Sequence, residues 1–221
     1  MKAFLFVFLI LCSSPTYAGV LEAIQSVCKI KEIDGSDCGS GGAYLQDEDY
    51  IYVITAGHVV ENIKTSVCLV ECYPNGRPIQ AVAGIITHKD YKSRKISEVE
   101  VDEPFRDLAI IRIEKSQFKS DKDYPKCIKL ATSHSLKLDD QILSIGCSGP
   151  EIPLKYPAMF NGYVSKLGNE RFWFQPNVVA GRSGSPVFDT SGDNIVGIVI
   201  WRTNNGGMAI DAKGISEHFK K

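Results

Sequence analysis

The chain has 221 residues, of which 44% are hydrophobic and 23% are charged, and its formal net charge is −1. This length and composition suit one globular unit with a sizeable core, or two small barrels that share a cleft. A nearly neutral chain has no electrostatic basis for binding nucleic acid or an anionic membrane, so neither partner is expected.

The first residues have the pattern of a secretory signal peptide. Lys2 is followed by the apolar run 3–11 and then by small residues that end at Ala18. The apolar run is far shorter than the ~20 residues that span a bilayer, which favours a cleaved segment over a membrane anchor. We predict cleavage after Ala18 and a secreted protein, extracellular or periplasmic. Lipidation at Cys12 is an alternative, although a bulky leucine precedes that cysteine.

Cysteine usage supports an exported protein. The chain has seven cysteines, and all except Cys12 follow the predicted cleavage point. An even number in an exported chain predicts up to three disulfides, whose pairing the sequence leaves open. Cys68 and Cys72 are close to zinc-ligand spacing, but no second close pair and no histidine cluster accompany them. We therefore expect neither a metal nor another cofactor.

Short β-type segments separated by turn signals occupy the first half of the chain. No helical pattern lies between them, which favours antiparallel sheets or barrels over a parallel sheet with crossover helices. The expected strands are 27–33, 42–45, 67–72, 82–87 and 108–113, together with the run 52–60, which presents a histidine near its end.

The second half repeats this pattern after a polar crossing segment. Its expected strands are 127–130, 141–146, 159–167, 171–175, 185–188, 195–201 and 208–210, and Asp211 is expected to cap a helix over 212–219. The predicted organisation is a signal peptide at 1–18, an N-terminal β-barrel at 19–114, a linker at 115–126, and a C-terminal β-barrel with the terminal helix at 127–221.

The hexapeptide 181–186 (GRSGSP) is the first candidate for catalytic chemistry. Its glycines flank Ser183 on a tight turn that feeds a strand, so the hydroxyl projects outward. The backbone N–H groups of Gly181 and Ser183 can then point to one spot, which is what an acyl-transfer enzyme needs to hold an oxyanion. Ser185 is expected to form hydrogen bonds within the turn.

A serine nucleophile needs a base, and two other motifs supply one. His58 follows a β-type run, and Asp107 stands at the start of another. Neutral imidazole can accept the serine proton, and an aspartate on the other ring nitrogen fixes the tautomer. His88, His134 and His218 are weaker candidates, because they lie in polar or terminal segments. The predicted catalytic residues are His58, Asp107 and Ser183.

These three motifs resemble those of the trypsin-like (chymotrypsin-fold) serine peptidases. TAGH at 55–58, DLAII at 107–111 and GRSGSP at 181–186 are similar to the histidine, aspartate and serine motifs of that family, in the same order. The serine motif with its strand, 181–188, is most similar to that of the secreted bacterial glutamyl endopeptidases. The resemblance implies an all-β fold of two antiparallel six-stranded β-barrels, with a short C-terminal helix here.

The resemblance implies a serine endopeptidase that acts on protein or peptide substrates through an acyl-enzyme, and we expect a monomer. An esterase with the same triad and a non-catalytic binding protein on a protease scaffold remain alternatives. Animal digestive members carry an aspartate just before the nucleophile, which receives the new N-terminus after zymogen cleavage. Arg182 stands there in this chain, so we expect activity without such cleavage.

Specificity is predicted from the segments on either side of the serine turn. By resemblance, the substrate-binding residues are Asn177, Val178, Val199, Ile200, Trp201 and Arg202. No carboxylate stands where trypsin carries one, and Val178 and Val199 replace the residues that hold glutamate in glutamyl endopeptidases. We expect a preference for medium apolar side chains before the cleaved bond, unless Arg202 turns into the pocket.

Overall fold

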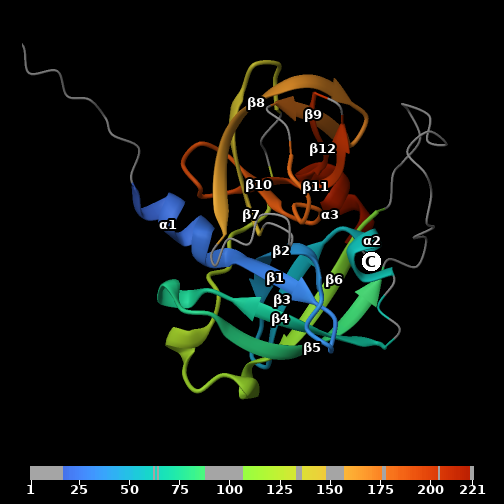
Figure 1. Cartoon of the computed structure of the whole chain (residues 1–221). Helices are drawn as coiled ribbons and strands as arrows, with labels where there is room; N and C mark the ends of the chain where they lie inside the picture. Colours follow the sequence, from blue (N-terminus) through green and yellow to red (C-terminus); the bar gives the residue numbers. More distant parts are fainter. Residues whose placement is uncertain are drawn as a thin grey trace, which may run out of the picture.

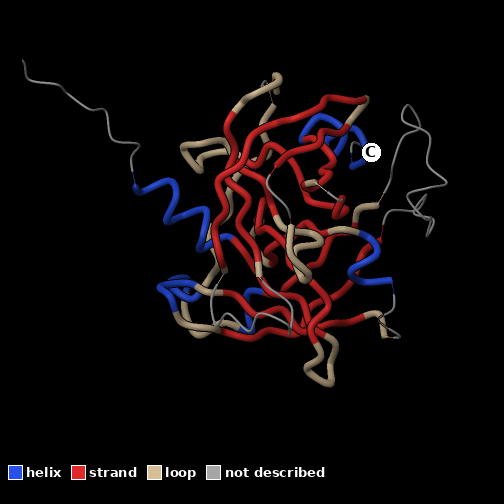
Figure 2. Tube along the Cα trace, turned by 45° about the horizontal axis from the view of Figure 1, so that its top comes forward, coloured by secondary structure: helices blue, strands red, loops and turns tan. Residues whose placement is uncertain are grey.

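The computed structural model describes residues 17–61, 63, 65–87, 107–132, 136–147, 157–175, 178–203 and 205–219. Most of this part of the chain is strand, and the strands form two closed barrels that lie one above the other in Figure 1. Figure 2 shows the helices at the outside of the strand framework. Each barrel has six antiparallel strands, which confirms the predicted fold class.

The first barrel consists of β1 (Val27–Lys31), β2 (Asp37–Gln46), β3 (Tyr50–Thr55), β4 (Val67–Cys72), β5 (Ile79–Thr87) and β6 (Ala109–Glu114). The strand order is β1-β2-β3-β6-β5-β4, and β1 closes the ring by pairing with β4. Burial in β4 alternates, with Cys68, Val70 and Cys72 buried. This two-residue period is expected where one face of a strand lines a barrel core.

The second barrel consists of β7 (Gln141–Gly146), β8 (Ala158–Gly168), β9 (Arg171–Gln175), β10 (Pro186–Phe188), β11 (Ile195–Thr203) and β12 (Gly206–Asp211). Their order is β10-β11-β12-β9-β8-β7, and β7 closes the ring against β10. The strand expected at 127–130 is absent. Leu130 makes only an isolated parallel bridge to Ile195, at a point where β10 pairs with β11 but β12 does not, since the β11–β12 pairing begins at Gly197.

In the described residues, the α-helices that accompany the barrels are α1 (Tyr17–Ser26), α2 (Gly57–Glu61) and α3 (Ala212–Phe219). The predicted cap of α3 is confirmed, because Asp211 Oδ1 accepts the Gly214 N–H at 2.7 Å. The helix α1 was not expected, and it crosses the predicted cleavage point. No helix in the described ranges is long and apolar enough to span a membrane.

The two barrels share a core. One buried apolar cluster includes Ile30 and Ile111 of the first barrel together with Ile145 and Ile198 of the second. Because this cluster continues from one barrel into the other, the barrels pack as one unit. Side chains at the facing ends of both barrels are thereby held in fixed relative positions.

Candidate active site

Strand pairing brings His58 and Asp107 together. In the pairing of β3 with β6, Thr55 stands opposite Ala109, so the end of β3 and the start of β6 lie at the same barrel edge. His58 follows β3 in the short helix α2, and Asp107 lies just before β6. The Asp107 side chain is buried, at 4% exposure. The pairing of β3 with β6 therefore brings together two motifs that are far apart in the sequence.

Asp107 binds His58 at two points. Its Oδ1 accepts the backbone N–H of His58 at 2.7 Å, and its Oδ2 lies 2.6 Å from the ring Nδ1. Burial lowers the pKa of His58, but the hydrogen bond to Asp107 and its charge, with a smaller contribution from Glu61, outweigh burial and raise the pKa above the usual histidine value. The imidazole is thus oriented and made more basic.

The turn that carries Ser183 depends on a glycine in the left-handed region. Gly184 has φ +80°, and a Cβ there would lie 2.1 Å from both the Ser40 carbonyl oxygen and Thr55 Oγ1. Only glycine permits this approach. The turn is closed by a hydrogen bond from the Ser185 N–H to the Arg182 carbonyl. The serine turn is therefore pressed against the end of β3, immediately before His58.

Ser40 of β2 joins the first barrel to this turn. Its N–H donates to the Ser183 carbonyl at 2.8 Å, and its hydroxyl donates to the Gly181 carbonyl at 2.9 Å. The same hydroxyl accepts the N–H of Cys147, which follows β7. We did not predict this role from the sequence. The run of small residues 39–42 (GSGG) was the available signal, because such a run permits close backbone approach.

The groups needed for acyl transfer remain available at the turn. Within the described ranges, the Ser183 hydroxyl and the backbone N–H groups of Gly181 and Ser183 make no hydrogen bond to protein. The Trp201 ring lies edge-on to the His58 ring, with centroids 6.2 Å apart. The arrangement provides an unengaged hydroxyl, two unengaged donors and an oriented base.

Residues 39–198 match the family model described as the trypsin-like peptidase domain. The chain belongs to this family. Comparison with curated proteins gave no match. Among solved structures, the fold is similar to that of Deg5, with a TM-score of 0.65, 19% identity, and coverage of 91% of this chain and 90% of that one.

Two further solved structures show the same likeness. A serine endoprotease from Yersinia pestis has a TM-score of 0.64 and 19% identity, with 91% of this chain and 64% of that chain covered. The MamO protease domain from Magnetospirillum magneticum has a TM-score of 0.63 and 15% identity, with 90% and 98% covered. At such identities the likeness shows the fold alone.

In this trypsin-like peptidase, the residue before Ser183 is Arg182, and its side chain points into the second barrel. Arg182 is only 2% exposed. Its Nη1 donates to the Ser144 carbonyl at 3.1 Å, and its Nη2 donates to the Ala158 carbonyl at 2.7 Å. The guanidinium carbon lies 4.1 Å from the centroid of the Phe160 ring, within cation–π range. Arg182 thus ties the serine turn to β7 and to the start of β8.

This arginine is a buried cation whose described hydrogen-bond partners are carbonyl oxygens. No carboxylate forms an ion pair with Arg182 in the part of the chain that the structure describes, and its Nε has no hydrogen-bond partner there. Burial lowers its pKa to about 10, against a smaller opposing effect of Cys147, so the side chain stays charged at neutral pH. Two carbonyl dipoles and an aromatic face stabilise this charge in place of a counter-ion.

Ser185 behaves differently from our expectation. Its hydroxyl is buried and has no hydrogen-bond partner in the described ranges, although its backbone N–H does close the turn. The hydroxyl fills the space beside Gly146, where an added Cβ would lie 1.8 Å from Ser185 Oγ. Ser185 therefore acts by close packing, and Gly146 is the residue that accommodates it.

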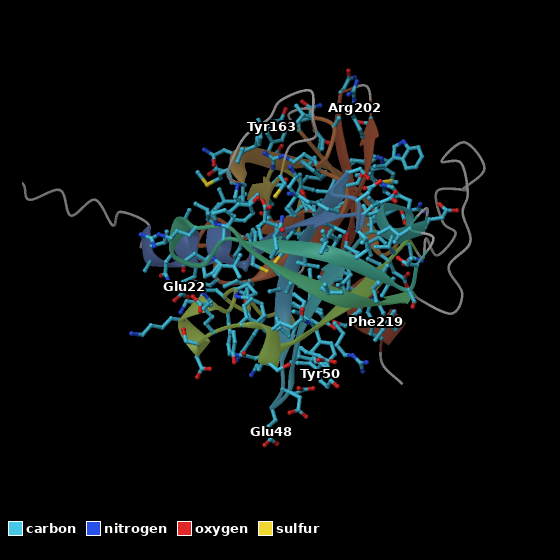
Figure 3. The ribbon with its side chains drawn as sticks, turned by 60° about the horizontal axis from the view of Figure 1, so that its bottom comes forward. Glu22, Glu48, Tyr50, Tyr163, Arg202 and Phe219 are labelled. Atoms are coloured by element: carbon cyan, nitrogen blue, oxygen red, sulfur yellow. The ribbon has the colours of Figure 1, made fainter. Side chains whose placement is uncertain are left out.

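The predicted substrate-binding residues do not all share one surface. Val178 lines an apolar crevice beside the turn, together with Phe160 and Phe174. Val199 and Ile200 are 1% and 0% exposed and pack in the barrel core. The remaining positions are as follows: Trp201 is half-buried, Arg202 is exposed and directed away from the molecule in Figure 3, and Asn177 lies outside the described residues.

The other sequence candidates are placed as follows. His88 and His134, like Cys12, lie outside the described residues, and the side chains of His218 and Cys38 are not described either. No disulfide joins two of the five described cysteines, Cys28, Cys68, Cys72, Cys127 and Cys147. No group of three or more potential metal ligands occurs among the described residues.

Proposed function

We propose that this trypsin-like peptidase is a serine endopeptidase that cleaves peptide bonds through an acyl-enzyme. The observation that carries the proposal is the two-point hold of Asp107 on His58, beside a serine turn with unengaged N–H groups. When Nδ1–H is donated to Asp107, the lone pair of the imidazole lies on Nε2, the nitrogen that serves as the base.

The residues then act in sequence. Ser183 attacks the substrate carbonyl carbon while His58 takes the hydroxyl proton, and the N–H groups of Gly181 and Ser183 hold the oxyanion. The His58 imidazolium next protonates the leaving amine, which departs and leaves an ester on Ser183. Water then attacks the ester carbon while His58 takes its proton. His58 returns that proton to the Ser183 oxygen as the C–O bond breaks and the acid is released. Asp107 stabilises the imidazolium in both halves without taking a proton itself.

Ser183→Ala tests this assignment, and Ser185→Ala is its matched control. Ser185 lies in the same turn, and its hydroxyl makes no hydrogen bond that the control would remove. We expect Ser183→Ala to lose casein hydrolysis by several orders of magnitude and to stop reacting with a fluorophosphonate probe, whereas Ser185→Ala keeps both. A Ser183→Ala protein with more than about a tenth of wild-type turnover would show that the nucleophile is another residue.

We further propose that the peptidase is secreted after cleavage at Ala18 and needs no later trimming. Arg182 supports the second point, because its bonds to the Ser144 and Ala158 carbonyls hold the serine turn without an N-terminal ammonium. Protein that starts at Gly19 should be active as purified. Intact-mass analysis that finds activity only in a further shortened species would contradict this proposal.

For specificity, we propose medium apolar side chains before the cleaved bond. The serine motif resembles that of glutamyl endopeptidases, but Val178 lines an apolar crevice beside the turn and the Trp201 ring lies beside His58, whereas Arg202 is exposed and directed away from the molecule in Figure 3. Apolar pockets discriminate by about 1–3 kcal/mol per methylene, so the preference should be moderate. A peptide-library profile dominated by glutamate, lysine or arginine would refute this specificity.

A further inference from the structure

Two cysteines face each other across the seam that closes the first barrel. Cys28 of β1 stands directly opposite Cys72 of β4 in the antiparallel ladder. Both side chains are completely buried, and their Sγ atoms lie 3.1 Å apart. We propose that Cys28 and Cys72 form a disulfide when the protein folds in an oxidising compartment.

Antiparallel pairing already supplies the geometry that a disulfide needs. Directly opposed residues in such a ladder have Cα atoms about 4.5–5.5 Å apart, and disulfides form at Cα separations of about 4.4–6.8 Å. Both side chains lie inside the barrel, so the Cβ atoms point in the same direction. A bond between the two sulphurs therefore requires rotation of side chains and no movement of the strands.

Other pairings are less well supported. Cys127 and Cys147 are near enough to influence the pKa of Cys28, but neither has a sulphur within hydrogen-bonding distance of another cysteine in the described ranges. Cys68 is on the same face of β4 as Cys72, four residues away, and β1 offers no cysteine opposite it. The seam thus selects one partner for Cys28.

The reaction is an ordinary thiol–disulfide exchange with a disulfide oxidant such as oxidised glutathione. One thiolate attacks the oxidant to give a mixed disulfide and a free thiolate, and the second cysteine then displaces the other glutathione. Two thiols lose their protons and two electrons, and the oxidant is reduced to two thiols. The hydrogen bond to Cys72 and burial raise the pKa of Cys28 well above its usual range, so exchange should occur before the barrel closes.

The bond would fix β1, which pairs with the strand that holds the serine turn. Cys28 and Lys29 of β1 pair with Gly41 and Ser40 of β2, and Ser40 binds the turn. A crosslink between residues 44 positions apart removes conformational freedom from the unfolded chain. From the usual dependence on loop length, reduction should lower Tm by roughly 5–15 °C.

The test uses the chain from Gly19, refolded in a buffer of reduced and oxidised glutathione. Free thiols are blocked with iodoacetamide under denaturing conditions, and disulfide-linked peptides are then mapped by mass spectrometry without reduction. Trypsin leaves Cys68 and Cys72 on one peptide, so a protease that cuts after Glu71 is added to separate them. We expect a linked pair that contains Cys28 and Cys72. Blocked Cys28 or Cys72, or a link from either to another cysteine, would overturn the proposal.

Thermal unfolding provides an independent readout that does not require catalysis. Wild-type protein and a Cys127→Ala control should both lose Tm when a phosphine reductant is added. The Cys28→Ala/Cys72→Ala double variant should start near the reduced wild-type Tm and lose much less on reduction. An equal shift in wild type and double variant would refute the pairing, and the peptide map decides the matter if the double variant does not fold.

Discussion

Arg182→Met separates the support of the serine turn from the overall stability of the barrel. Methionine has similar length and keeps apolar contact with Phe160, but it cannot donate to the Ser144 and Ala158 carbonyls. Replacing a buried charge by an apolar side chain of similar volume is often neutral for stability. We therefore expect a small change in Tm together with a large loss of turnover.

The size of the loss follows from the two hydrogen bonds that the variant lacks. Hydrogen bonds from a charged donor contribute about 1.5 kcal/mol or more each, so about 3 kcal/mol no longer holds the turn in its catalytic conformation. If the ordered and displaced forms of the turn are about equally populated in the wild type, the ordered fraction falls by a factor of about 75 in the variant. Relief of guanidinium burial offsets part of this, and we expect kcat to fall roughly 20- to 70-fold.

The assay compares kcat, KM and the rate of fluorophosphonate labelling in the variant and in Arg171→Met. Arg171 is a matched control, because it is 3% exposed and lies in the same barrel on β9. Loss should appear in kcat and labelling rate for Arg182→Met only. In Arg182→Ala, added methylguanidinium should restore part of the rate by occupying the vacated site. Full activity in Arg182→Met, or equal losses in both methionine variants, would refute the reasoning.

Two further predictions concern the base and the glycine of the turn. Because the pKa of His58 is raised, kcat/KM should fall about tenfold per pH unit on acidification, from a midpoint above the usual histidine value of about 6.5. Asp107→Asn removes the two largest raising effects and leaves burial, so this midpoint should move to lower pH while kcat falls by about 10⁴; a stationary midpoint would contradict the assignment. Gly184→Ala and Gly35→Ala both place alanine at positive φ, +80° and +89°, but only the first meets backbone atoms. Gly35→Ala should lower Tm by a few degrees, and Gly184→Ala should lower it much further and abolish activity; similar Tm values for the two would show that the contact with Ser40 is unimportant.

Much of the fold was accessible from the sequence, because barrel strands bury one face. The alternation in 67–72 and the motif 107–113 located β4 and β6 to within a residue. The segment 127–130 misled us because it is equally apolar, but it makes only one bridge, at Ile195, beyond the residues where β12 pairs with β11. Local pattern cannot reveal how far a segment runs alongside a barrel strand.

Within the site, the sequence indicated which residue types take part, but it did not show where their side chains point. His58 was recognisable because it follows an apolar run, and Asp107 because it precedes one. The pairing of β3 with β6 brings the end of the first run to the start of the second. From the sequence, Arg182 indicated only that the aspartate of the animal digestive members is missing. No sequence pattern shows that its side chain turns inward and donates to two carbonyls. The Cys28–Cys72 contact was equally hidden, because it depends on the register of strands distant in sequence.

Because Ser40 of the first barrel binds the turn that carries Ser183, the position of the nucleophile depends on contact between the two barrels. The turn is encoded in the second barrel, yet its carbonyls are bound by a strand of the first. The Ser40 amide can exchange with solvent deuterium only when this contact opens, so its exchange rate measures the free energy of separating the barrels at that edge. Heat inactivation should then follow the exchange of this amide and precede loss of the strand signal in circular dichroism. A peptidase built in this way would lose activity through local separation of the barrels while each of them is still folded.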